Sequence, residues 1–217
     1  FTTEALKSFL VENHFPKYIA DQLFDWVYKK HIVEPDKMQN ISKDNRKKLA
    51  ELIQFQPFKH VDSVTSKEEL AIKNMCTLDD DKVVECVILK EKTYNTLCIS
   101  SQVGCPVDCK FCLTGVMGFK RQLSSAEIIA QIVYAFSIGH PISNIVFMGM
   151  GEPFLNYDNT IESANLLHHP EGINMGAWRI TISTAGIIRK INQYTREGHP
   201  YKLAVSLNAS NELQRLK

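Results

Sequence analysis

The chain has 217 residues, of which 44% are hydrophobic and 23% are charged, and its formal net charge is +1. This length allows one large domain or two smaller ones, and the balanced charge means that any nucleic-acid site would need local clustering of basic residues. No apolar run approaches the roughly 20 residues of a membrane helix, and the amino-terminal residues lack a secretory signal, so we expect a cytoplasmic protein without a membrane partner.

Residues 1–58 are expected to form a small helical domain. Apolar residues recur at helical spacing between Leu6 and Val27, and Ser42 suits an N-cap for the helix that includes residues 46–50. The basic residues of this domain could form a face for RNA phosphates, although interspersed Asp and Glu make an ordinary solvated surface the simpler interpretation. These basic residues are Lys29, Lys30, Lys43, Arg46, Lys47 and Lys48.

Residues 59–94 change to a β pattern. Residues 69–75 and 83–89 alternate or carry β-branched side chains, and the acidic run from Asp79 to Asp81 separates them as a turn, which predicts a β-hairpin. Another expected strand, residues 96–100, leads into a cysteine-rich loop.

From residue 95 to 217, expected strands and helices alternate. Strands are predicted at 144–148, 179–183 and 203–207, with helices beginning near 124, 160 and 187. This alternation predicts an α/β fold with a parallel sheet, either open or an incomplete barrel of about four βα units. In barrels the chemistry lies at the carboxyl ends of strands.

Cysteines supply the strongest chemical signal. Four of the six fall between Cys98 and Cys112, which favours reduced, metal-binding thiols over disulfides. Cys105, Cys109 and Cys112 are separated by three and then two residues, so one loop can direct three thiols to one centre. Three thiolates on an iron–sulfur cluster would leave one iron open for a small molecule. The alternatives are a zinc knot, which would need a fourth ligand nearby, or three buried thiols.

This run, with Phe111 before its last cysteine, resembles the radical S-adenosylmethionine (SAM) superfamily. The resemblance implies a radical SAM barrel and a 4Fe-4S cluster held by Cys105, Cys109 and Cys112, whose open iron binds SAM and whose electron cleaves it to a 5′-deoxyadenosyl radical. Residues 148–153 are similar to the superfamily's glycine-rich stretch. There Gly151 would let the backbone approach the SAM methionine group, and Glu152 would accept a hydrogen bond from its ammonium.

Four segments, residues 22–30, 97–105, 118–121 and 149–153, resemble the RlmN/Cfr family over essentially the whole chain. The resemblance implies a methyltransferase that uses two SAM molecules to methylate an adenine of 23S rRNA and, in some members, of tRNA. The RlmN branch, which acts on carbon 2, fits better than the Cfr branch, which acts on carbon 8. An electron donor such as flavodoxin is implied as a partner.

The family's functional residues map onto this sequence by motif. Glu85 matches a proton acceptor, and Cys98 matches the cysteine that resolves a covalent protein–RNA intermediate. Ser183 matches a SAM-contacting serine. A further SAM-contacting triplet is matched by Ser206, Leu207 and Asn208, although the family often has His at the last position.

The sequence departs from the family in one important respect. The family's methyl-carrying cysteine lies beyond residue 217, and no cysteine follows Cys112 here. The resemblance therefore implies a truncated chain that is inactive as it stands. Two alternatives stay open: a non-catalytic RNA-binding fragment with a cluster or zinc, and a radical SAM enzyme that acts at carbon 8 or on another substrate.

Overall fold

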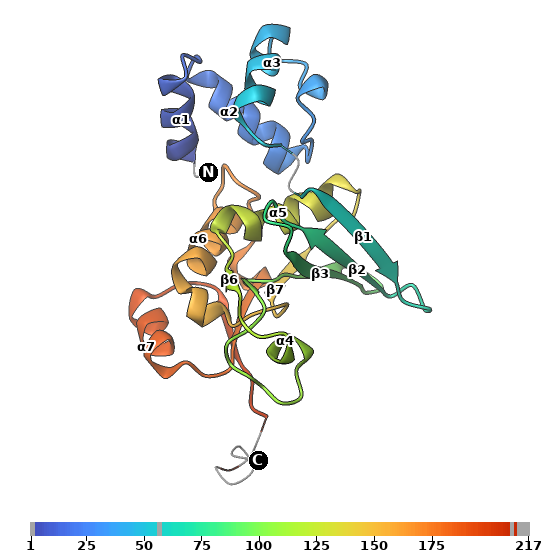
Figure 1. Cartoon of the computed structure of the whole chain (residues 1–217). Helices are drawn as coiled ribbons and strands as arrows, with labels where there is room; N and C mark the ends of the chain where they lie inside the picture. Colours follow the sequence, from blue (N-terminus) through green and yellow to red (C-terminus); the bar gives the residue numbers. More distant parts are fainter. Residues whose placement is uncertain (1–2, 56–57, 209–210, 212–217) are drawn as a thin grey trace.

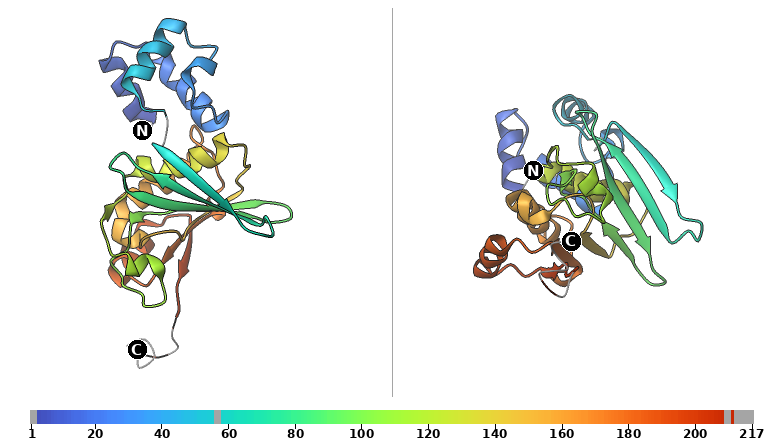
Figure 2. Two further views of the ribbon diagram at one scale, coloured as in Figure 1. Left: turned by 45° about the vertical axis from the view of Figure 1, so that its right-hand side comes forward. Right: turned by 60° about the horizontal axis from the view of Figure 1, so that its bottom comes forward.

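The structure is a computed structural model that describes residues 3–55, 58–208 and 211. A group of short helices precedes a mixed sheet that carries longer helices on one face (Figure 1). The helical group lies at one end of the molecule, and the loop with α4 (Leu113–Val116) lies toward the other end (Figures 1 and 2).

The helical group has its own small core. It contains α1 (Thr3–Glu12), α2 (Tyr18–Phe24), the π-helical turn η1 (Asp25–Lys29), the 3-10 turn η2 (Pro35–Lys37) and α3 (Lys43–Leu52). The predicted N-cap is confirmed, because the Ser42 hydroxyl accepts the Asn45 backbone N–H at 3.3 Å. Leu10, Ile19, Met38 and Leu49 are buried at the centre of this cluster, so the short helices are stabilised mainly by packing.

Seven strands form the main sheet, in the order β1-β2-β3-β4-β7-β8-β9. The first three are antiparallel, and β4, β7, β8 and β9 are parallel, which confirms the α/β class and the incomplete barrel of about four βα units. Within the described residues the sheet does not close, because β1 and β9 are its edges. The strands are β1 (His60–Thr65), β2 (Ala71–Thr77), β3 (Val83–Lys90), β4 (Asn95–Cys98), β7 (Asn144–Phe147), β8 (Ile180–Thr184) and β9 (Lys202–Val205).

The predicted hairpin is confirmed as β2 and β3, which pair from Ala71 opposite Leu89 to Thr77 opposite Val83. Sequence patterns gave no indication of β1, whose side chains are almost all exposed and therefore show no apolar alternation. Because β1–β3 and β4 belong to one continuous sheet, the division at residue 94 runs through it, and the limits of the three expected domains stay predictions.

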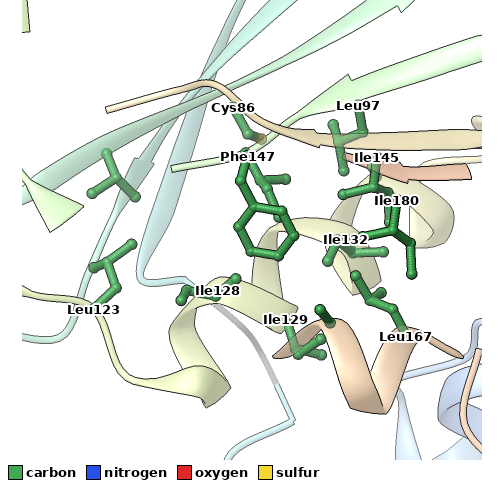
Figure 3. Close-up of a cluster of buried hydrophobic side chains, with 14 of the residues drawn as sticks. Cys86, Leu97, Leu123, Ile128, Ile129, Ile132, Ile145, Phe147, Leu167 and Ile180 are labelled. Carbon is green, nitrogen blue, oxygen red and sulfur yellow. The ribbon is translucent and has the colours of Figure 1, made fainter. Parts of the chain in front are cut away.

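Three helices connect the parallel strands and cover one face of the sheet: α5 (Ser125–Ser137), α6 (Tyr157–His168) and α7 (Ile188–Glu197). Figure 3 shows the resulting core, in which Ile132 of α5 and Leu167 of α6 lie against Ile145 and Phe147 of β7. A capping box between Ser124 and Glu127 fixes the start of α5. None of the helices in the described part of the chain is long and apolar enough to cross a membrane.

Candidate functional site

The cysteine loop leaves the sheet through a narrow neck. Two very short strands, β5 (Gln102–Val103) and β6 (Arg121–Gln122), pair antiparallel and bring its two ends together. Gly104 has a φ of +73°, and a Cβ placed there would lie 1.8 Å from the Gly118 carbonyl oxygen. A residue with a side chain therefore cannot occupy this position without opening the neck.

All three thiols of the loop are half-buried. The Cys112 backbone N–H donates to the Cys109 carbonyl at 2.9 Å, and Gly115 N–H donates to the Cys112 carbonyl at 3.0 Å. Burial raises the pKa of Cys105, with further increases from the charges of Cys109, Glu152 and Cys112, so these groups lie within electrostatic range of one another. The three thiols thus belong to one tight loop, and Glu152 lies within electrostatic range of Cys105.

No three His, Cys, Asp or Glu side chains among the described residues converge closely enough to hold a metal ion. A 4Fe-4S cluster has a different requirement, because each cysteine binds its own iron at a corner of the cluster. Three half-buried thiols on one constrained loop fit that donor set.

The glycine-rich stretch packs against the strand that precedes the cysteine loop. A Cβ at Gly149 would lie 2.7 Å from Ser100 Oγ, and one at Gly151 would lie 2.5 Å from Gln102 Cβ. Gly151 also has a φ of +101°. Both glycines are therefore required by the close contact between the glycine-rich stretch and residues 99–102. That Gly151 also lets SAM approach the backbone stays a prediction.

Glu152 is 4% exposed and joins two loops at the carboxyl ends of neighbouring strands. Its Oε1 accepts the Phe154 N–H at 3.0 Å, and its Oε2 accepts the Ala185 N–H at 2.7 Å. Its own N–H donates to Gln102 Oε1 at 2.7 Å. Each carboxylate oxygen keeps a lone pair for a further donor, so Glu152 is rigidly held and can still accept from a ligand ammonium.

Strand register brings the two expected catalytic residues onto one face of the sheet. Cys98 lies opposite Val87 of β3, and side chains alternate along a strand, so Glu85 and Val87 point to the same side as Cys98. Cys86 and Ile88 point to the other side and are fully buried against the helices. Glu85 and Cys98 therefore share the helix-free face of the sheet, which we call the open face.

The SAM-contacting residues expected from the sequence lie farther along this face. Cys98 is level with Val146 of β7, which is level with Thr181 of β8, so Ser183 also points to the open face. The Ser183 and Ser206 hydroxyl oxygens are 3.5 Å apart. Leu207 and Asn208 follow β9 and are exposed. Thus the structure brings together Glu85, Cys98, Ser183 and Ser206 on one face, with Leu207 and Asn208 at its margin.

Two contacts on the open face were not expected from the sequence. Lys73 Nζ lies 3.1 Å from Glu85 Oε1, because β2 pairs with β3 in a register that motifs do not reveal. Burial raises the pKa of the Cys98 thiol to about 11, although the Met148 backbone N–H beside its sulfur acts to lower it. Cys98 is therefore a protonated thiol at neutral pH.

A buried polar framework supports the loops and was also missed. The Gln131 side chain bonds both the N–H and the carbonyl of Ser100, at 2.8 and 2.9 Å. The Asn156 side chain donates to the carbonyls of Ser101 and Leu123, each at 2.7 Å. Such residues lack a local signal, because a buried amide and an exposed amide look alike in a sequence.

Comparison with known families assigns both parts of the chain. Residues 1–55 match the family described as "Ribosomal RNA large subunit methyltransferase N-terminal domain". Residues 99–217, which include the cysteine loop and the carboxyl ends of β7, β8 and β9, match the radical SAM superfamily.

Relatives named "Probable dual-specificity RNA methyltransferase RlmN" share much of the sequence. The protein from Dictyoglomus thermophilum is 44% identical over 206 residues, which are 93% of this chain and 59% of the relative. The one from Spiroplasma citri is 40% identical over 215 residues, which are 97% of this chain and 62% of the relative. The chain thus spans about six tenths of the length of these relatives.

A solved structure described as a radical SAM methyltransferase from Sphaerobacter thermophilus has the same fold. It superposes with a TM-score of 0.93 at 39% identity, and the match covers 99% of this chain and 64% of that one. The thiol loop, the glycine-rich stretch and the parallel strands therefore have a common explanation: this chain belongs to the radical SAM superfamily.

Proposed function

We propose that this chain is part of a radical SAM methyltransferase that methylates carbon 2 of an adenine in 23S rRNA and in tRNA. The observation that carries the proposal is the open face, which Glu85, Cys98, Ser183 and Ser206 share. The cysteine loop follows β4, the strand that carries Cys98. The names of the relatives support an RNA methyltransferase of dual specificity.

Cys105, Cys109 and Cys112 would hold the 4Fe-4S cluster. When bound, the cluster would supply the electron that converts SAM to methionine and a 5′-deoxyadenosyl radical. Glu152 would orient the SAM ammonium with its remaining lone pairs, while Phe154 and Ala185 N–H groups keep its carboxylate fixed. Gly151, Ser183, Ser206, Leu207 and Asn208 would complete the SAM site at the carboxyl edge of the sheet.

Glu85 and Cys98 would act on the RNA. Glu85 would take the proton that leaves the adenine ring carbon, since its carboxylate stands on the open face with Lys73 holding one oxygen. The Cys98 thiolate would attack the sulfur that links protein and RNA, forming a disulfide while the carbon–sulfur bond breaks and its electron pair stays with the RNA. The thiol must first lose its proton, because the thiolate is the nucleophile and the pKa of Cys98 is raised to about 11. Before the radical forms, a first SAM would methylate a cysteine outside residues 1–217, and a second SAM would yield the radical.

RNA phosphates would bind mainly along α3. Lys29 and Lys30 of the expected basic face lie 3.9 and 2.8 Å from Asp25 carboxylate oxygens, and Arg46 donates to the Asp36 carbonyl. The remaining lysines, Lys43, Lys47 and Lys48, are exposed on α3. An adenine must leave its stack to reach the open face, so extrusion of the target base is expected.

The cofactor is tested by preparing the chain without oxygen, reconstituting it with iron and sulfide, and measuring iron, sulfide and visible absorption. We expect about four irons per chain and a visible band that fades with a chemical reductant. Replacing Cys105, Cys109 and Cys112 by Ala should abolish both, whereas Cys76→Ala should not. Stoichiometric zinc without iron–sulfur absorption would instead identify the zinc-containing fragment.

The substrate is tested with the full-length gene product, SAM, a reductant, and unmodified 23S rRNA or tRNA. Mapping of methylated bases should find 2-methyladenine in both RNAs. Methylation at carbon 8, or of neither RNA, would contradict the proposed specificity. In the same assay Cys98→Ala should accumulate a covalent protein–RNA adduct, and a preparation free of adduct would remove the role proposed for Cys98.

A further inference from the structure

A second surface lies at the amino-terminal ends of the parallel strands, opposite the ends that lead into the cysteine loop. Trp178 and Arg179 belong to the turn η4 (Ala177–Arg179), immediately before β8, and Lys202 is the first residue of β9. The cysteine loop and Glu152 instead follow the carboxyl ends of β4 and β7. Because these strands are parallel, the two groups lie at opposite ends of the strands.

An exposed indole is the centre of this surface. The Trp178 side chain is 61% exposed, although the Arg179 guanidinium lies 4.8 Å and the Lys202 ammonium 5.6 Å from the centre of its ring. More than half of this large aromatic side chain thus stays in contact with solvent beside two cations. An exposed aromatic ring with cations beside it is the combination that proteins use to bind single-stranded nucleic acids.

A cavity of about 340 Å³ adjoins the same arginine. Arg179 Nη1 donates to the Ser143 carbonyl at 3.3 Å, which uses one of its five N–H donors and leaves others for a phosphate. His31 forms part of the lining, with its ring stacked on Phe136 at 4.0 Å between centroids. None of the nine described residues that line this cavity is acidic.

From this arrangement we infer that Trp178, Arg179, Lys202 and the adjoining cavity form a binding site for a single-stranded RNA segment. One base would stack on Trp178, and the neighbouring phosphates would contact Arg179 and Lys202. The inference rests on the proposed RNA methylation for the nature of the ligand and adds a contact outside the methylation site. An RNA that reaches both sites must extend past the sheet, whose strand β8 alone spans roughly 17 Å at about 3.3 Å per residue.

Tryptophan fluorescence provides a direct test, because the chain has two tryptophans, Trp26 and Trp178. A Trp26→Phe variant of the chain leaves Trp178 as the only reporter. Titration with a 12-nucleotide single-stranded RNA should quench its fluorescence, since stacked bases quench indole. Dextran sulfate, a polyanion without bases, should bind through charge and leave the fluorescence unchanged. Equal quenching by both would overturn the base-stacking site.

Affinity measurements with labelled RNA give a second readout. Trp178→Leu should weaken binding roughly 5- to 150-fold, as expected for the loss of one stacked base. Arg179→Met and Lys202→Met should each lower the slope of log K against log salt by about 0.7. Lys67→Met, in the exposed turn between β1 and β2, is the matched control and should leave affinity unchanged. Unaltered binding by Trp178→Leu would overturn the inference.

The full-length gene product separates this inference from the proposed function. If another part of the protein covers the surface, acrylamide will fail to quench Trp178 and RNA will have no effect, which would refute the RNA site while methylation remains intact. Quenching by RNA in a protein that binds no iron would have the opposite meaning. That result would support the RNA site and refute the proposed radical SAM activity.

Discussion

The Glu152 carboxylate accepts the backbone N–H of Ala185 at 2.7 Å, and this bond ties the loop after β7 to the loop after β8. The second carboxylate oxygen accepts the Phe154 N–H, so one buried side chain fixes two backbone segments. In the proposed enzyme the same carboxylate would orient SAM. Structural support and ligand binding would therefore depend on one residue.

Replacing Glu152 by Gln should destabilise the chain. A carboxamide has one oxygen acceptor, so either the Phe154 or the Ala185 N–H loses its partner in a buried position. The free energy of unfolding should fall by about 1–3 kcal/mol in urea denaturation. Glu12→Gln, an exposed change at the end of α1, is the control and should stay within about 0.5 kcal/mol of the original chain. Equal stability of the two variants would refute the bridging role.

Gly104 allows a separate test of the loop neck. Gly104→Ala combines a left-handed φ of +73° with a clash against the Gly118 carbonyl, whereas Gly139→Ala has a φ of +83° and no atom within 4 Å of the new Cβ. Gly139→Ala is the control, and it should lower the free energy of unfolding by about 1–2 kcal/mol because of its backbone conformation alone. Gly104→Ala should cost about 1–3 kcal/mol more and reduce iron uptake during reconstitution. Similar losses for both alanines would argue against a closed neck.

The Cys98 thiol should lose its proton only at high pH. Because burial raises its pKa to about 11, the thiolate fraction should increase about tenfold per pH unit through pH 10. Alkylation of the Cys98 peptide by iodoacetamide, followed by mass spectrometry, should rise with the same slope. A free cysteine in a short peptide, measured in parallel, should level off above about pH 9.5, one unit above its ordinary pKa. If Cys98 levelled off with it, the thiol would not be in the environment that the structure gives it.

The interface between the helical group and α5 should weaken in acid. Burial lowers the pKa of His31 from its usual 6.5, although a hydrogen bond with the Tyr28 backbone opposes the shift. Its neighbours in the cavity include Phe136 and the positive Arg179. The unfolded chain then binds this proton more readily, so the stability present above about pH 6.5 is lost as the pH falls toward the lowered pKa.

Urea denaturation between pH 5 and 7.5 measures this effect. His31→Gln should reduce the fall in unfolding free energy at acid pH. Part of it should persist, because burial also lowers the pKa of His140, helped by Lys90. An unchanged profile in His31→Gln would show that His31 is equally solvated in the folded and unfolded chain.

Local sequence signals determined much of the fold. Ser42 indicated the start of α3, and the acidic turn at residues 79–81 indicated the separation of β2 from β3. The alternation of expected strands and helices after residue 124 predicted the parallel strands. These features depend on neighbours within a few residues, so the sequence displays them directly. The spacing of Cys105, Cys109 and Cys112 likewise indicated the superfamily, because all three cysteines lie on one short stretch of chain.

Only the tertiary structure decided which residues meet. A shift of one residue in the β3–β4 register would move Cys98 to the face opposite Glu85, and no motif specifies that register. Three relationships join residues that are far apart in the sequence. Lys73 contacts Glu85, 12 positions away, and Glu152 bonds to Ala185, 33 positions away. The surface around Trp178 likewise includes Lys202 from the next strand. Such relationships depend on strand pairing and burial across the whole sheet. The sequence by itself therefore determined the cysteine spacing and the superfamily, and the fold decided on which face of the sheet each side chain lies.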